Sequence, residues 1–198
     1  MDRHLRIGVF GGTFDPIHAG HVETAEAVHR TLDLDRTLLV VANEPWQKEG
    51  TRSVTPAEDR LAMVEAAVAG RPGLEASRLE IDRGGPSYTV DTVDQLHGLY
   101  PGSELFLVVG ADVVPDLPTW HNEATLQESV VLVVVDRPGS TREKPPPGWN
   151  AVSVPVPPFD VSSTELRARL EAGEPVDGLV PEGVIRCIRG RNLYATSR

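Results

Sequence analysis

The sequence predicts a doubly wound α/β fold, in which helices cover both faces of a parallel sheet. Near-continuous apolar segments alternate with helical segments along the whole chain, and this alternation is typical of parallel sheets. A length of 198 residues suits one domain with a substantial core. We therefore expect a single domain over residues 1–198, ending in a short helical segment at 162–198.

Six apolar segments predict the strands, at residues 5–10, 37–42, 74–82, 104–109, 129–135 and 151–156. Their length and continuous hydrophobicity suit strands that are buried on both faces. Ligands of such sheets bind beyond the carboxyl ends of the strands, where the strand order reverses. The residues after the first, fourth and fifth strands are therefore the expected site.

Helical spacing of apolar residues predicts helices at 21–32, 89–99, 162–172 and 181–189, and another that opens at Thr55. Thr55 is the expected N-cap of that helix, with Pro56 in the first helical position. Glu58 then completes an expected capping box.

Composition narrows the class of partner and the compartment. The 19 Lys and Arg against 29 Asp and Glu give a net charge of −10, so a general nucleic-acid partner is not expected. The longest apolar run, 130–135, is far short of the roughly 20 residues of a membrane span. The N-terminus lacks the apolar region of a signal peptide, so we expect a cytoplasmic protein with no membrane partner.

The single cysteine, Cys187, excludes an intrachain disulfide and is expected to be packed in an apolar stretch.

A glycine-rich loop joins the first predicted strand to the first predicted helix. Residues 11–21 read Gly-Gly-Thr-Phe-Asp-Pro-Ile-His-Ala-Gly-His. Gly11 and Gly12 let backbone approach a ligand closely, and a helix N-terminus offers unpaired N–H groups to an anion. His18 and His21 share one helical face and can donate hydrogen bonds to the same anion. The loop therefore predicts a polyphosphate site.

Two other interpretations of this loop stay open from the residues alone. The glycines could form only a tight turn with both histidines on the surface. The histidine pair could also bind a metal, although the sequence offers no convincing third ligand. The loop does not fit G-x-G-x-x-G and the chain has no P-loop sequence, which argues against a hydride-cofactor fingerprint and a P-loop NTPase.

A second motif, Ser-Ser-Thr-Glu-Leu-Arg at 162–167, opens a predicted helix. Ser162 and Glu165 form an expected capping box, so a well-capped helix is the simpler interpretation. In the functional interpretation, the Ser163 and Thr164 hydroxyls and Arg167 meet the N–H groups of one helix end. That arrangement would be a second anion site.

The two motifs, in this order, resemble the signature of the nucleotidyltransferase superfamily that carries His-x-Gly-His. The form Gly-Gly-Thr-Phe-Asp-Pro-Ile-His is similar in particular to the bacterial nicotinate-nucleotide adenylyltransferases. The resemblance implies a Rossmann-like nucleotidyltransferase fold and catalytic roles for His18, His21, Lys48 and Arg167. It implies ATP contacts from both motifs and from the turn after the fourth strand: Gly11, Gly12, Thr13, Phe14, His18, His21, Gly110, Asp112, Ser162, Ser163, Thr164 and Arg167.

Segments between the motifs extend the resemblance. Residues 45–48 (Pro-Trp-Gln-Lys) resemble the family segment whose lysine reaches the phosphates, and 86–92 resemble the family's Pro-Ser-Tyr-Thr-x-Asp-Thr. The implied contacts of the acceptor substrate are Lys48, Tyr88, Thr89, Trp120 (stacked on the pyridine) and Arg137 (on phosphate). One departure is Val-Ala-Asn-Glu at 41–44, because relatives place a proline directly after the second strand.

The resemblance implies transfer of AMP from ATP to nicotinate mononucleotide in NAD biosynthesis, with ATP and that nucleotide as partners. Mg²⁺ would be carried by ATP, and no metal site built by the protein is expected. Alternatives are a transferase for phosphopantetheine or another phosphate acceptor, and a non-catalytic nucleotide sensor on the same fold. Selectivity for nicotinate over nicotinamide, and homo-oligomerisation, stay open.

Overall fold

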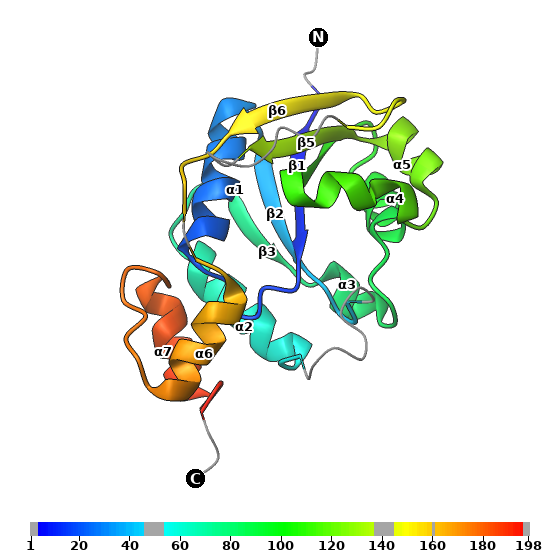
Figure 1. The fold of residues 1–198 in the computed structure, drawn as a ribbon. Coiled ribbons are helices and arrows are strands. Elements are labelled where there is room, and N and C mark those ends of the chain that lie inside the picture. The colour runs from blue at the N-terminus through cyan, green and yellow to red at the C-terminus, as the bar shows by residue number, and fades with distance from the viewer. Residues whose placement is uncertain (1–3, 46–53, 137–144, 160, 196–198) are drawn as a thin grey trace.

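The computed structural model describes residues 4–45, 54–136, 145–159 and 161–195. Its strands form one six-stranded parallel sheet in the order β3-β2-β1-β4-β5-β6 (Figure 1). The order reverses between β1 and β4, which confirms the doubly wound prediction. The strands are β1 (Arg6–Gly12), β2 (Arg36–Val41), β3 (Leu74–Ser77), β4 (Glu104–Gly110), β5 (Val131–Asp136) and β6 (Ala151–Pro155).

Helices pack on both faces of this sheet. On one face, residues of α4 and α5 share an apolar cluster with alternate residues of the four central strands, such as Val9 and Leu107. On the other face, α1, α2, α6 and α7 pack against the intervening residues, such as Leu39 and Phe106. The helical elements are α1 (Ala19–Thr31), α2 (Ala57–Val68), α3 (Leu79–Arg83), α4 (Thr89–Leu99), the 3₁₀ helix η2 (Ala111–Thr119), α5 (Glu123–Ser129), α6 (Ser163–Ala172) and α7 (Glu182–Gly190).

Two predictions about secondary structure are wrong, and one stretch was left without a prediction. The expected strand 74–82 ends at Ser77, and α3 follows it. Pro56, not Thr55, is the N-cap of α2, and no side chain caps that end. η2 and α5 fill the stretch between β4 and β5, which carried no prediction.

In the described part of the chain, no helix combines the length and the hydrophobicity that crossing a membrane requires. Cys187 is half-buried and packs against the α2–α7 side of the core, as expected. Burial raises the pKa of its thiol, which keeps the thiol protonated and weakly nucleophilic.

Candidate active site

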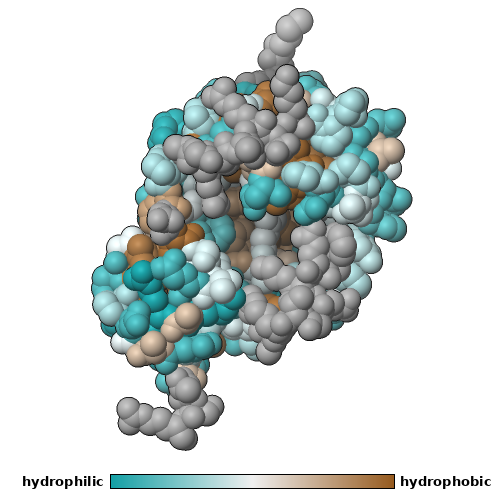
Figure 2. Space-filling view, in the orientation of Figure 1, coloured by the Kyte–Doolittle hydropathy of each residue, from teal (hydrophilic) through white to brown (hydrophobic). Residues whose placement is uncertain are grey.

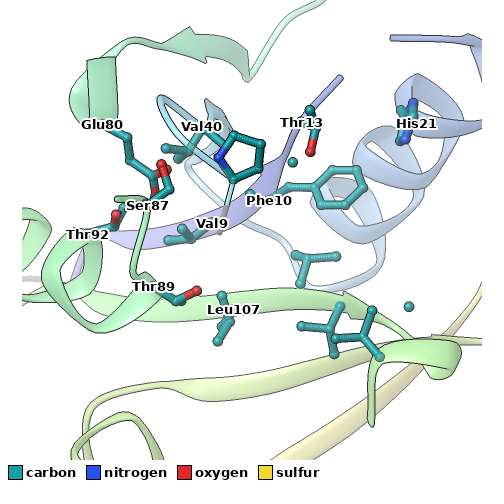
Figure 3. Close-up of a pocket in the computed structure, with 18 of the residues that line it drawn as sticks. Val9, Phe10, Thr13, His21, Val40, Glu80, Ser87, Thr89, Thr92 and Leu107 are labelled. Carbon is teal, nitrogen blue, oxygen red and sulfur yellow. Dashed lines mark hydrogen bonds between the residues drawn. The ribbon is translucent and has the colours of Figure 1, made fainter. Parts of the chain in front are cut away.

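A cavity opens where β1 and β4 diverge. The register of this pair runs from Arg6 opposite Glu104 to Val9 opposite Leu107, and each strand continues past that point. The ends of both strands therefore line a cavity of about 290 Å³ (Figure 3). In the space-filling view this face of the molecule is hollowed, and apolar residues are visible in the hollow (Figure 2). The cavity lies where the topology places ligands in open α/β sheets.

Many of the predicted site residues line this one cavity. They come from the ends of β1 and β4, from α1 and α4, and from η2 and the residue after it. Among the described residues, the predicted ones in the lining are Gly11, Gly12, Thr13, His21, Thr89, Gly110, Asp112 and Trp120.

A side chain would meet different surroundings at the two glycines of the loop. A Cβ on Gly12 would lie 2.8 Å from the ring of Phe14, so glycine lets that ring pack beneath the strand end. A Cβ on Gly11 would meet no heavy atom within 4 Å and would extend into open space. Since Gly11 lines the cavity, the fold itself gives no steric reason for the lack of a side chain there.

His18 and His21 form a stacked pair at the start of α1, with ring centroids 3.7 Å apart and planes inclined by 31°. The His18 backbone N–H donates to Nδ1 of His21 at 3.3 Å, and the Phe14 ring meets the His21 ring edge-on at 5.2 Å. A neutral imidazole that accepts at Nδ1 carries its proton on Nε2. His21, which lines the cavity, can therefore donate a hydrogen bond to a ligand. His18 is the N-cap residue of α1 and is 4% exposed.

The second motif lies against the first. Ser163 Oγ donates to the backbone oxygen of Pro16 at 3.0 Å, and Arg167 Nη1 donates to that of Asp15 at 2.7 Å. Arg167 also donates from Nη2 to Thr164 Oγ1 at 3.0 Å. The N-terminal end of α6 is thereby fixed to the loop that precedes the histidine pair.

Only one of the two hydrogen bonds of the predicted capping box at Ser162 is present. Ser162 Oγ accepts the backbone N–H of Glu165 at 3.1 Å, as expected for an N-cap. The carboxylate of Glu165 instead accepts from Arg169 at 2.6 Å, one helical turn further along.

Arg60 is a buried cation that the sequence analysis missed. Its side chain is 1% exposed and donates to the backbone oxygens of Thr55 at 2.7 Å, Thr13 at 2.9 Å and Asn43 at 3.1 Å. It thus ties the start of α2 to the loops after β1 and β2. In the sequence, the one sign of this role was an arginine next to the apolar positions of α2.

Trp120 lines the cavity, as do the polar residues Glu80, Thr89 and Thr92. The indole Nε1 is buried and has no hydrogen-bond partner among the described residues, which is unusual for a buried donor. Tyr88 stacks on His121 with ring centroids 4.7 Å apart, so one of the histidines without a predicted role contacts the Pro-Ser-Tyr-Thr segment. Glu80, at the cavity wall, accepts a hydrogen bond from Thr92 Oγ1 at 2.6 Å.

Lys48 and Arg137 lie outside the described residues, so their predicted contacts remain predictions. The residues that lead toward Lys48 are held by the segment before α4. Asn43 N–H donates to Ser87 Oγ at 2.8 Å, and Ser87 N–H donates to the backbone oxygen of Glu44 at 3.0 Å. The unusual Asn-Glu pair after β2 therefore joins two walls of the cavity.

Comparison with known proteins agrees with this geometry. Residues 9–169 match the sequence model of the cytidylyltransferase-like family. A protein of Corynebacterium kroppenstedtii named as a probable nicotinate-nucleotide adenylyltransferase is 46% identical over 195 residues, which cover 97% of this chain and 92% of the relative. A Thermus thermophilus protein of the same name is 46% identical, with 96% of this chain and 100% of the relative covered.

A solved structure shares the fold at low sequence identity. The Plasmodium falciparum nicotinic acid mononucleotide adenylyltransferase complexed with NaAD aligns with a TM-score of 0.78 and 19% identity, covering 96% of this chain and 98% of that one. With both motifs joined at the switch point of the sheet and relatives alike over nearly their full length, the chain belongs to the cytidylyltransferase-like family and, within it, to the nicotinate-nucleotide adenylyltransferases.

Proposed function

We propose that the chain transfers the AMP part of ATP to nicotinate mononucleotide, giving nicotinate adenine dinucleotide and pyrophosphate. The observation that carries this proposal is the junction of the two motifs. Arg167 and Ser163 bind the backbone oxygens of Asp15 and Pro16 beside the cavity at the switch point. Two helix ends that can bind anions therefore meet at one site, which suits a triphosphate.

The residues near this junction divide between the phosphates of ATP. His18 and His21 bind the α- and β-phosphates and stabilise the charge that develops during transfer. Ser163, Thr164 and Arg167 bind the β- and γ-phosphates. Gly11, Gly12, Thr13, Phe14, Gly110, Asp112 and Ser162 complete the ATP site, with Lys48 and Arg137 offsetting the repulsion between the two anionic substrates.

The other wall of the cavity binds the pyridine nucleotide. Trp120 presents a ring for stacking and a buried indole N–H. Thr89 also lines the cavity, and Tyr88 directly precedes it in the chain. The name and the bound dinucleotide of the P. falciparum structure, and the names of the two relatives, support nicotinate mononucleotide as the acceptor.

In the reaction, a phosphate oxygen of nicotinate mononucleotide attacks the α-phosphorus of ATP in line. The bond from the α-phosphorus to the bridging oxygen breaks, and pyrophosphate leaves with that electron pair. The protein supplies alignment and positive charge rather than a nucleophile. Mg²⁺ would be carried by ATP and would help to offset the charge of the triphosphate, because it retains water and prefers phosphate oxygens.

Pyrophosphate release tests the proposal. Purified protein is mixed with Mg²⁺-ATP and, in parallel, nicotinate mononucleotide, nicotinamide mononucleotide or phosphopantetheine. Release with nicotinate mononucleotide alone is expected. Release with only phosphopantetheine would keep the chemistry and overturn the acceptor. ATP binding measured by calorimetry without release for any acceptor would favour a nucleotide sensor.

A further inference from the structure

The C-terminal end of the chain reaches the loop that carries the first motif. Tyr194 OH donates a hydrogen bond to Asp15 Oδ1 at 2.6 Å, across 179 positions of sequence. The Tyr194 ring packs against the apolar cluster that also contains Phe14 and Ile17. The residues matched by the family model end at 169, so this contact comes from outside the matched region.

Asp15 is a buried residue of that loop with several hydrogen-bond partners. Its side chain is 1% exposed, and Oδ2 accepts the backbone N–H of Thr55 at 3.4 Å while Oδ1 accepts from Tyr194. Its backbone oxygen accepts from Arg167. A buried carboxyl group depends on such donors, because burial without them is costly.

The position of Asp15 in the chain makes these contacts relevant to the histidines. Phe14, directly before it, packs against the ring of His21. Pro16 and Ile17, directly after it, are buried and lead to His18, the N-cap of α1. A shift of Asp15 would therefore be passed to both histidine rings over short, packed segments.

We propose that Tyr194 is a positioning residue for adenylyl transfer: its hydroxyl holds Asp15, and Asp15 holds the loop that presents Phe14 and His18. This role rests on the function proposed above. The alternative is that Tyr194 only fills space with its ring. The two differ in the hydroxyl, which Tyr194→Phe removes while it keeps the ring.

Kinetics of Tyr194→Phe test the role. We expect kcat to fall about fivefold to tenfold, the scale of one lost hydrogen bond to a carboxyl group, with the KM for nicotinate mononucleotide unchanged. Tyr100→Phe is the matched control, because Tyr100 OH accepts from Arg36 at 3.2 Å and its ring packs on the opposite side of the sheet. Its kcat should stay within twofold of wild type.

A double-mutant cycle separates positioning from packing. In an Asp15→Ala background, Tyr194→Phe should cause no further fall in kcat, because the hydroxyl acts through Asp15. The proposal is overturned if Tyr194→Phe leaves kcat within twofold of wild type. It is equally overturned if the fall is the same size with and without the Asp15 carboxyl group.

Hydrogen exchange gives a readout that does not depend on turnover. The backbone amides of residues 13–15, 17 and 18 should exchange faster in Tyr194→Phe than in wild type or Tyr100→Phe, in the absence of ligand. The exchange measurement does not need Asp15→Ala, so it tests the positioning role even if that variant does not fold. An inactive wild type would defeat the proposed function alone, and unchanged exchange would defeat the positioning role.

Discussion

Arg167 donates a hydrogen bond to the backbone oxygen of Asp15 at 2.7 Å, although 152 positions separate them in the sequence. The same guanidinium bonds to Thr164 Oγ1, so one side chain joins the two motifs through neutral acceptors. Donors that are fixed before the ligand arrives need no reorganisation when charge develops on it. The acidic chain thus gathers part of its limited positive charge at one site.

Gly11 tests whether a ligand passes over the end of β1. Its added Cβ would meet no heavy atom within 4 Å, so Gly11→Ala should fold with wild-type stability. The methyl group would project into the cavity and should raise the KM for ATP about tenfold or more, because close backbone approach is lost. Steady-state kinetics at saturating nicotinate mononucleotide measure this.

Gly98→Ala is the control for that change. Gly98 lies in α4 and is also open to solvent around its added Cβ, so alanine should leave the KM for ATP unchanged and stabilise the helix by about 0.5–1 kcal/mol. Equal KM values for ATP in Gly11→Ala and wild type would remove Gly11 from the ATP site.

His18 should be required for the chemical step. His18→Ala should lower kcat by about 10²–10³, the scale of losing one preorganised donor. His97→Ala, which removes a ring bonded to the Ser129 backbone oxygen at 3.1 Å, should leave kcat unchanged. A change of less than about threefold in His18→Ala would mean that the stacked pair acts through His21 alone.

Most of the fold could be predicted because buried strands and helices differ in hydrophobic spacing. The failures have local causes. Leu79 and Ile81 alternate with polar residues as a strand would, but Arg78 and Asp82 pair at 2.8 Å one helical turn apart and the segment forms α3. Between β4 and β5, Pro115 and Pro118 interrupt the helical pattern of the sequence, and the segment forms the 3₁₀ helix η2.

The candidate site was predictable where motifs are contiguous and was not where partners are distant. The residues of the first motif lie beside the cavity because one loop carries them. The roles of Arg60 and Tyr194 depend on backbone oxygens and on a carboxyl group far away in sequence. The sequence around Arg60 or Tyr194 does not indicate which distant group each one bonds to. Only the folded structure shows these contacts.

Removal of the Arg60 guanidinium should be strongly destabilising. Arg60→Met would leave three part-buried backbone oxygens without this donor, and we expect a loss of about 3–5 kcal/mol in the free energy of unfolding by urea denaturation. Arg60→Lys should recover only part of it, because an ammonium group lacks the planar fork that reaches all three oxygens. Arg186→Met, at an exposed pair with Glu182, should cost less than about 1 kcal/mol. A similar cost for both methionine variants would contradict the role of Arg60 in joining the loops.

Alkaline unfolding should report on Tyr194. Burial, and then the hydrogen bond to Asp15, raise the pKa of Tyr194 above its ordinary value of 10.0. The unfolded chain therefore ionises this phenol first, so its contribution to stability is complete below pH 10 and is lost as the pH rises further. From this one group, the free energy of unfolding should decline by up to about 1.4 kcal/mol per pH unit above about pH 10.

The slope of that decline can be assigned to the phenol. Burial also raises the pKa of Cys187 above 9.0, which adds a decline in the same direction, so the comparison is made in a Cys187→Ala background. There, Tyr194→Phe should lose less stability per pH unit between pH 10 and pH 11.5 than the parent, because phenylalanine has no proton to release. Parallel curves for the two chains would mean that Tyr194 ionises equally in the folded and unfolded states. Tyr194 would then not be buried against Asp15 in solution, and the hydrogen bond between them could not hold the loop.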